Sequence, residues 1–264
     1  MKRTNAPAPR VLIILALAAL AFLVLPLIGL LLETPWTRLP ELLTSQAATE
    51  ALRLSLITSL FAAFFATILG VPLAWVLARK EFFGKRLVRG LVLLPLVLPP
   101  VVGGVTLLTA FGRRGLVGQY LYDWFGIQLP FSTAGVVMAA TFVAMPFLVI
   151  TVEGALRSID SRYEQAARTL GARPRTVLLR ITLPLISASL IAGIVLAWAR
   201  ALGEFGATIT FAGNFPGVTQ TLPLAVYSAL EVSRDEAIAL SLVLLAVSLT
   251  VLVSLRGRFL GGRA

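Results

Sequence analysis

The chain has 264 residues, of which 58% are hydrophobic and only 13% are charged, with a formal net charge of +11. This composition leaves too little polar surface for a soluble domain of this size, and it indicates an all-α, polytopic membrane protein. Cysteine and histidine are both absent from the sequence. Disulfides, zinc, haem or copper sites of the usual kind, and catalysis by a thiol or an imidazole are therefore not expected, and we predict no cofactor.

Six apolar stretches have about the length that a helix needs to cross the hydrocarbon core of a bilayer. They cover residues 11–32, 54–78, 91–111, 134–152, 185–205 and 238–255. The first stretch follows a short basic segment, but it is too long for a signal peptide and no small-residue cleavage site follows it. We therefore expect six transmembrane helices, the first of them uncleaved.

The basic residues are concentrated in alternate loops of this predicted arrangement. Most lysines and arginines lie in the N-terminal segment, in residues 79–90, in residues 157–183 and in the C-terminal tail, whereas the other loops carry most of the acids. This is the positive-inside distribution, which predicts that both termini are cytoplasmic. Membrane topology explains the net charge better than nucleic-acid binding does, so we expect no nucleic acid partner.

The third apolar stretch contains Pro95, Pro99, Pro100, Gly103 and Gly104. Proline removes a backbone donor and clashes with the preceding turn, so these residues cannot all lie in a regular helix. Carbonyl groups freed by such a break need protein or water around them inside a membrane. Two interpretations stay open. The segment lies inside the bundle near a cavity, which makes Pro99 and Pro100 candidates for lining a pathway or gate, or it is a kinked packing helix.

The loop that follows, residues 112–133, is rich in glycine and aromatic residues. Tyr120, Tyr122 and Trp124 suit a membrane–water interface. We favour this interfacial role over the alternative, a docking surface for an external partner.

The fifth apolar stretch carries an unusual pair of charges. Arg200 and Glu204 are four residues apart, on one face of a helix, and an unpaired cation at mid-membrane costs about 2.5–3.5 kcal/mol on insertion scales. The spacing favours an ion pair that locks the helix near its outer end. The alternative is that Arg200 offers positive charge to a passing anion. The candidates for lining a pathway are Thr106, Thr141, Thr208 and Thr210, although threonine hydroxyls on helices more often bond to their own backbone.

Beyond this stretch, residues 214–217 carry turn signals, and helical periodicity returns from Thr221 to Leu230. We expect a short helix at the outer leaflet.

The basic loop between the fourth and fifth stretches has its own helix signals. Asp160 or Ser161 can cap a helix that starts near Arg162, and Gly171 can end it. Pro174 is well placed in the first turn of a second helix. We therefore predict a short helix–turn–helix on the cytoplasmic side, which a solvated basic loop, the alternative, would not require.

The spacing within this loop resembles the EAA motif of ABC importer permeases, in which Glu-Ala-Ala, three residues, Gly, nine residues and Ile-x-Leu-Pro follow one another. The matching positions here are Gln165, Ala166, Ala167, Gly171, Ile181, Leu183 and Pro184. Gln165 stands where glutamate is usual, and Glu164 lies one place earlier. In that family the motif forms a coupling helix that docks in a cleft of the ATP-hydrolysing subunit. The resemblance implies this role for Glu164 through Gly171, whose small residues would let a partner approach closely.

The resemblance covers residues 51–256, the core of a type I ABC importer permease fold, with the coupling loop at residues 160–184. It leaves residues 1–50 as an N-terminal transmembrane helix with its outer loop and residues 257–264 as a cytoplasmic tail. The stretch ARALGEFGATITFAGNFPGVTQTLPLAVYSALE, residues 199–231, looks like the molybdate permeases in particular. Sulfate/thiosulfate and tungstate permeases are the alternatives.

This resemblance implies a homodimer in a bacterial or archaeal inner membrane, two copies of an ATPase subunit, and a periplasmic or lipid-anchored oxyanion-binding protein. It further implies molybdate uptake by alternating access. The sequence contains no Gly-x-x-x-x-Gly-Lys-[Ser/Thr] phosphate loop, so we expect a non-enzymatic subunit driven by a partner. A channel or membrane anchor subunit is the alternative from a different class, but it does not account for the motif.

Overall fold

The computed structural model describes residues 9–160 and 162–259, and this part of the chain is entirely helical apart from loops. Its elements, in chain order, are α1 (Arg10–Leu32), α2 (Leu39–Leu43), α3 (Gln46–Arg79), α4 (Lys85–Val97), α5 (Pro100–Phe111), α6 (Gly118–Phe125), α7 (Thr133–Ser158), α8 (Arg162–Thr169), α9 (Pro174–Val177), the π-helical turn η1 (Leu178–Thr182), α10 (Leu183–Leu185), α11 (Ser187–Leu202), α12 (Gly206–Phe211), α13 (Leu222–Val232) and α14 (Arg234–Phe259).

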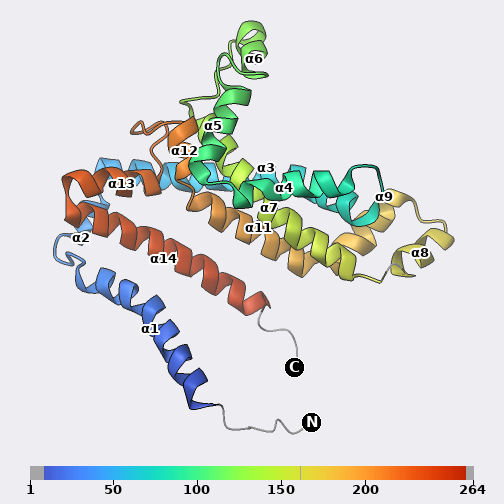
Figure 1. The fold of residues 1–264 in the computed structure, drawn as a ribbon, viewed down its shortest axis with the longest axis horizontal. Helices are drawn as coiled ribbons and strands as arrows, with labels where there is room; N and C mark the ends of the chain where they lie inside the picture. The colour runs from blue at the N-terminus through green and yellow to red at the C-terminus, as the bar shows by residue number, and fades with distance from the viewer. Residues whose placement is uncertain (1–8, 161, 260–264) are drawn as a thin grey trace.

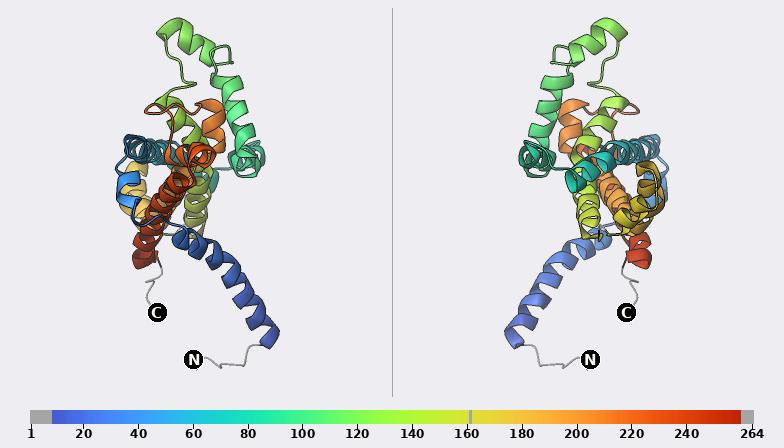
Figure 2. Two further views of the ribbon diagram at one scale, coloured as in Figure 1. Left: turned by 90° about the vertical axis from the view of Figure 1, so that its left-hand side faces the viewer. Right: turned by 90° about the vertical axis from the view of Figure 1, so that its right-hand side faces the viewer.

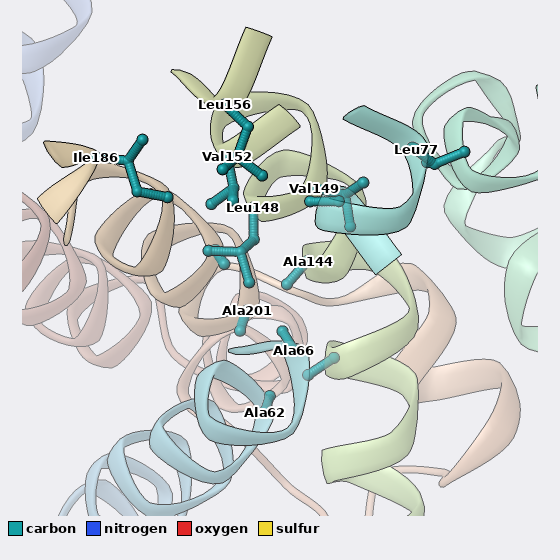
Figure 3. Packing of buried hydrophobic residues seen from close by; sticks show 13 residues of the cluster. Ala62, Ala66, Leu77, Ala144, Leu148, Val149, Val152, Leu156, Ile186 and Ala201 are labelled. Atoms are coloured by element: carbon teal, nitrogen blue, oxygen red, sulfur yellow. The ribbon is translucent and has the colours of Figure 1, made fainter. Parts of the chain in front are cut away.

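The core lies where α3, α7 and α11 pack against one another (Figure 1). Figure 3 shows its buried side chains, which are alanines and the aliphatic residues leucine, valine and isoleucine. Leu148 of α7 lies between two glycines: a Cβ added to Gly70 would be 3.1 Å from one Leu148 methyl group, and one added to Gly193 would be 3.0 Å from the other. Small residues let helices approach closely where no aqueous hydrophobic effect drives them together, which is why this core needs alanine and glycine.

Within the described residues, three helices are long and apolar enough to cross a membrane, namely α1, α3 and α7. The segment from α9 to α10 together with α11 forms a fourth candidate, bent by 75°. Helix α1 lies apart from the bundle and buries none of its residues (Figure 2). These candidates establish several apolar helices, whereas the six spans and the cytoplasmic placement of both termini stay predictions.

The predicted break in the third apolar stretch is confirmed, because residues 91–111 are divided between α4 and α5. Helix α4 ends at Val97, Pro99 has extended backbone, and Pro100 is in the first turn of α5. A proline is tolerated there because the first amides of a helix have no intrahelical partner.

The N-terminal boundary of the predicted core, between residues 50 and 51, lies inside a continuous helix. Helix α3 begins at Gln46, where the Ser45 hydroxyl accepts a hydrogen bond from the backbone N–H of Ala48, and it continues without interruption across residues 50 and 51. The connection between α1 and α3 therefore ends at Ser45, and it contains the short helix α2.

Candidate functional site

The loop at residues 160–184 folds as the predicted helix–turn–helix. Helix α8 begins at Arg162, whose backbone N–H donates to Asp160 Oδ1 at 2.9 Å; Ser161, the other predicted cap, lies outside the described residues. Gly171 has φ +82°, and the N–H groups of Gly171 and Ala172 donate to the carbonyls of Arg168 and Ala167 at 2.9 and 3.0 Å. These two bonds form a Schellman motif, whose left-handed position favours glycine.

The inward face of α8 is fixed by a buried carboxylate. Glu164 is only 6% exposed, and its Oε1 lies 2.9 Å from Nη2 of Arg79, the last residue of α3. The same oxygen accepts a hydrogen bond from the Thr182 hydroxyl at 3.0 Å. Glu164 thereby joins α8 to α3 and to the π-helical turn η1, three segments that are separate in the sequence.

The outward face of α8 is apolar at Tyr163 and Ala166, and Leu170 adds a third apolar side chain in the turn directly after the helix. Tyr163, Ala166 and Leu170 follow one another at intervals of three and four residues, and all three are exposed, Leu170 to 88%. The two alanines of the motif therefore differ, because Ala166 faces outward whereas Ala167 is buried against the chain itself. The sequence pattern gave no sign of this difference.

The other motif positions are exposed. Gln165 and Gly171 lie on the surface, and so does Pro184, which lies in α10 directly after η1. Proline has no amide hydrogen to donate to the preceding turn, and the widened π-helical turn ends at Thr182, two residues before Pro184. The structure brings Glu164 and Thr182 together but leaves Pro184 away from that contact.

The predicted Arg200–Glu204 pair bridges a second break, between α11 and α12. Glu204 is 2% exposed, and its Oε2 lies 2.7 Å from Arg200 Nη2. Its Oε1 accepts a hydrogen bond from the backbone N–H of Ala207 at 2.7 Å, so the carboxylate also caps α12. One carboxylate oxygen thus accepts a hydrogen bond, and the other lies at ion-pair distance from Arg200 without a hydrogen bond of its own. This arrangement favours the interpretation as a structural lock.

The two breaks lie close together, because α5 packs tightly on α12. A Cβ added to Gly104 would lie 2.5 Å from the Cβ of Thr210, and one added to Gly206 would lie 2.7 Å from the Cβ of Pro100. Pro99 and Pro100 are themselves exposed. The start of α5 therefore presents a free surface on one side and fixes α12 on the other.

The threonine candidates for the pathway are either hydrogen-bonded within their own helix or buried. Thr106, Thr141 and Thr210 each donate a hydrogen bond to a carbonyl of their own helix, and Thr208 is buried. In the part of the chain that the structure describes, no three acidic side chains come together as a metal site requires.

Residues 66–263 match the family described as the inner membrane component of binding-protein-dependent transport systems. The chain is 49% identical over 250 residues to the molybdenum transport system permease protein ModB of Mycobacterium bovis, covering 95% of this chain and 94% of that protein. It is 35% identical over 237 residues to the sulfate transport system permease protein CysT of Salmonella typhimurium, covering 88% of this chain and 85% of that protein.

A solved structure shares the fold. A bacterial alginate ABC transporter, crystallised in complex with an alginate pentasaccharide-bound periplasmic protein, contains a chain that superposes with a TM-score of 0.75 at 20% identity. The match covers 94% of this chain and 92% of the other. The fold of an ABC importer permease is thereby established, and the chain belongs to the family of inner membrane components of binding-protein-dependent transport systems.

Proposed function

We propose that this chain is the permease subunit that forms the transmembrane pathway for molybdate uptake in an ABC importer. The observation that carries the proposal is the difference between two relatives: 49% identity to a permease named for molybdenum transport, against 35% to one named for sulfate transport. The subunit would work as a homodimer in the inner membrane, with two ATPase subunits and a periplasmic or lipid-anchored oxyanion-binding protein.

The geometry supports a route for the mechanical signal. The exposed stripe of Tyr163, Ala166 and Leu170 offers the ATPase subunit an apolar surface on α8, and the buried Glu164–Arg79 pair ties this helix to the end of α3. A movement of the ATPase subunits would therefore shift the bundle core along with α8. The paired breaks at the start of α5 and at α12 are where the pathway would open in an alternating-access cycle.

ATP-dependent uptake into proteoliposomes tests the substrate. With the permease, its ATPase and its binding protein reconstituted together, molybdate should accumulate only when ATP is present, and equal sulfate should leave the rate unchanged. Tungstate shares the shape and charge of molybdate, so it is expected to compete. Equal competition by sulfate would favour the sulfate permease alternative, and accumulation without ATP would favour a channel.

Ala166→Arg tests the docking surface separately from transport. Ala166 is exposed on α8, so a long cation there should leave the fold intact while it blocks close approach of the ATPase. We expect capture of the ATPase subunit by the tagged permease to fall by at least about tenfold, the equivalent of about 1.4 kcal/mol. Ala166→Ser, which keeps the small volume, is the control and should retain capture. Unchanged capture by the arginine variant would contradict this assignment of the outward face.

A further inference from the structure

A basic groove lies where the loop between α3 and α4 meets the end of α7. Residues 81–87, Arg89 and Arg157 line it, and its volume is about 660 Å³. In Figure 1 this loop is the teal turn beside the α9 label. The groove is separate from the outward stripe of α8 and from both helix breaks, so the proposed transport cycle gives it no role.

Cations outnumber acids around this groove. Lys85, Arg86, Arg89 and Arg157 line it, and Lys85 lies 2.7 Å from Glu81. The hydrogen bond that Lys85 donates and its charge hold the pKa of Glu81 below the ordinary value, so this carboxylate is ionised at neutral pH.

The remaining acid is shared between two arginines. Arg89 and Arg157 both pair with the buried Glu153, which fixes the two guanidinium groups side by side. Within the described residues Arg86 forms no ion pair and is exposed. Four cations thus face two carboxylates, and the groove keeps a surplus of positive charge that an anion would neutralise.

The groove also has an apolar rim. Gly84 turns the chain with φ +82°, and directly before it the side chain of Phe83 is fully exposed; Phe82 and Leu87 are exposed as well. Large apolar side chains gathered at one exposed spot indicate an apolar partner. A free phosphate ion would satisfy the cations but not this rim.

The groove lies at the ends of two membrane-spanning candidates, and this position indicates the kind of partner. Arg79 ends the membrane-spanning candidate α3, and Arg157 lies in the last turn of the candidate α7. The groove therefore lies at the level where the hydrocarbon core gives way to lipid headgroups. Basic pockets between transmembrane helices at this level bind anionic headgroups.

We propose that this groove binds an anionic phospholipid. Its phosphate would lie between Arg86 and the Arg89–Arg157 pair, and its acyl chains would contact Phe83 and Leu87. The site would hold the α3–α4 loop at the membrane surface, next to the helix that carries Arg79.

Native mass spectrometry of the detergent-purified permease tests this proposal without reference to transport. The protein is mixed with equal amounts of phosphatidylglycerol and phosphatidylcholine, and the retained lipids are counted. Wild type should retain phosphatidylglycerol preferentially, and Arg86→Gln should lower that preference on the order of fivefold, as expected for one basic residue at a lipid surface. Arg114→Gln, an equal charge change at an exposed arginine in the outer loop, should leave the preference unchanged.

Further variants and competitors separate the sources of the anion. Arg86→Lys should keep the preference, and Phe83→Ser should weaken retention even though all four cations remain. Equal retention of both lipids by wild type, equal losses in the two glutamine variants, or displacement by inorganic phosphate would each overturn the proposal. So would loss of the lipid on addition of the ATPase subunit, which would show that the groove is a protein interface.

Discussion

Glu164→Ala should uncouple ATP hydrolysis from uptake while the ATPase subunit still binds. The variant leaves the Arg79 guanidinium largely buried beside α8 without its carboxylate, and breaking a buried ion pair from one side costs about 3–5 kcal/mol. The lower end applies here because the Arg79 side chain is 17% exposed. Without this contact α8 can move while α3 stays in place, so we expect the ATP hydrolysed per oxyanion transported to rise steeply.

Hydrogen exchange separates this effect from a loss of docking. Backbone amides of α8 should exchange faster in Glu164→Ala, whereas capture of the ATPase subunit should persist because the outward stripe is unchanged. Glu41→Ala, which removes an exposed carboxylate on α2, outside this loop, is the control and should behave as wild type. The double variant Arg79→Met/Glu164→Met replaces the pair by apolar side chains and should regain much of the lost protection. Slow exchange together with normal coupling in the single variant would disprove the linkage.

The course of the chain through this site could be predicted from the sequence because its signals are local. Asp160, Gly171 and Pro174 set the limits of α8 and α9 through contacts within a few residues. The inward direction of Glu164 could not be predicted, because its partners Arg79 and Thr182 are 85 and 18 residues away. Helical spacing shows which side chains share a face, but only the packed fold determines whether that face is buried.

The helix breaks show the same division between local and distant causes. Pro99 and Pro100 predicted the first break, and the spacing of Arg200 and Glu204 predicted their ion pair. The contact between these two regions, where Gly104 meets Thr210, has no signature in either stretch. The apolar stretches predicted spans from length and hydropathy alone, and that criterion cannot show that residues 91–111 bend into two helices.

Glu204→Ala should destabilise the whole permease, because this buried carboxylate serves two partners. It pairs with Arg200 and caps α12 through Ala207. Breaking a buried pair costs about 3–5 kcal/mol, and the lower end applies because the Arg200 side chain is 26% exposed. Loss of the cap adds about 1 kcal/mol. The apparent melting temperature in detergent should fall strongly. Glu231→Ala, which removes an exposed carboxylate, is the control and should leave it unchanged.

A double variant decides between the two interpretations of this pair. Arg200→Met/Glu204→Gln removes both charges, while the glutamine oxygen can still accept the hydrogen bond from Ala207, so stability should return towards that of wild type. If the pair is a lock, uptake should return with stability, because the only function of the two charges is to hold α11 and α12 together. If Arg200 attracts the passing anion, the stable double variant should still transport slowly. Because Glu204 already pairs with Arg200 and accepts a hydrogen bond from Ala207, we expect uptake and stability to recover together.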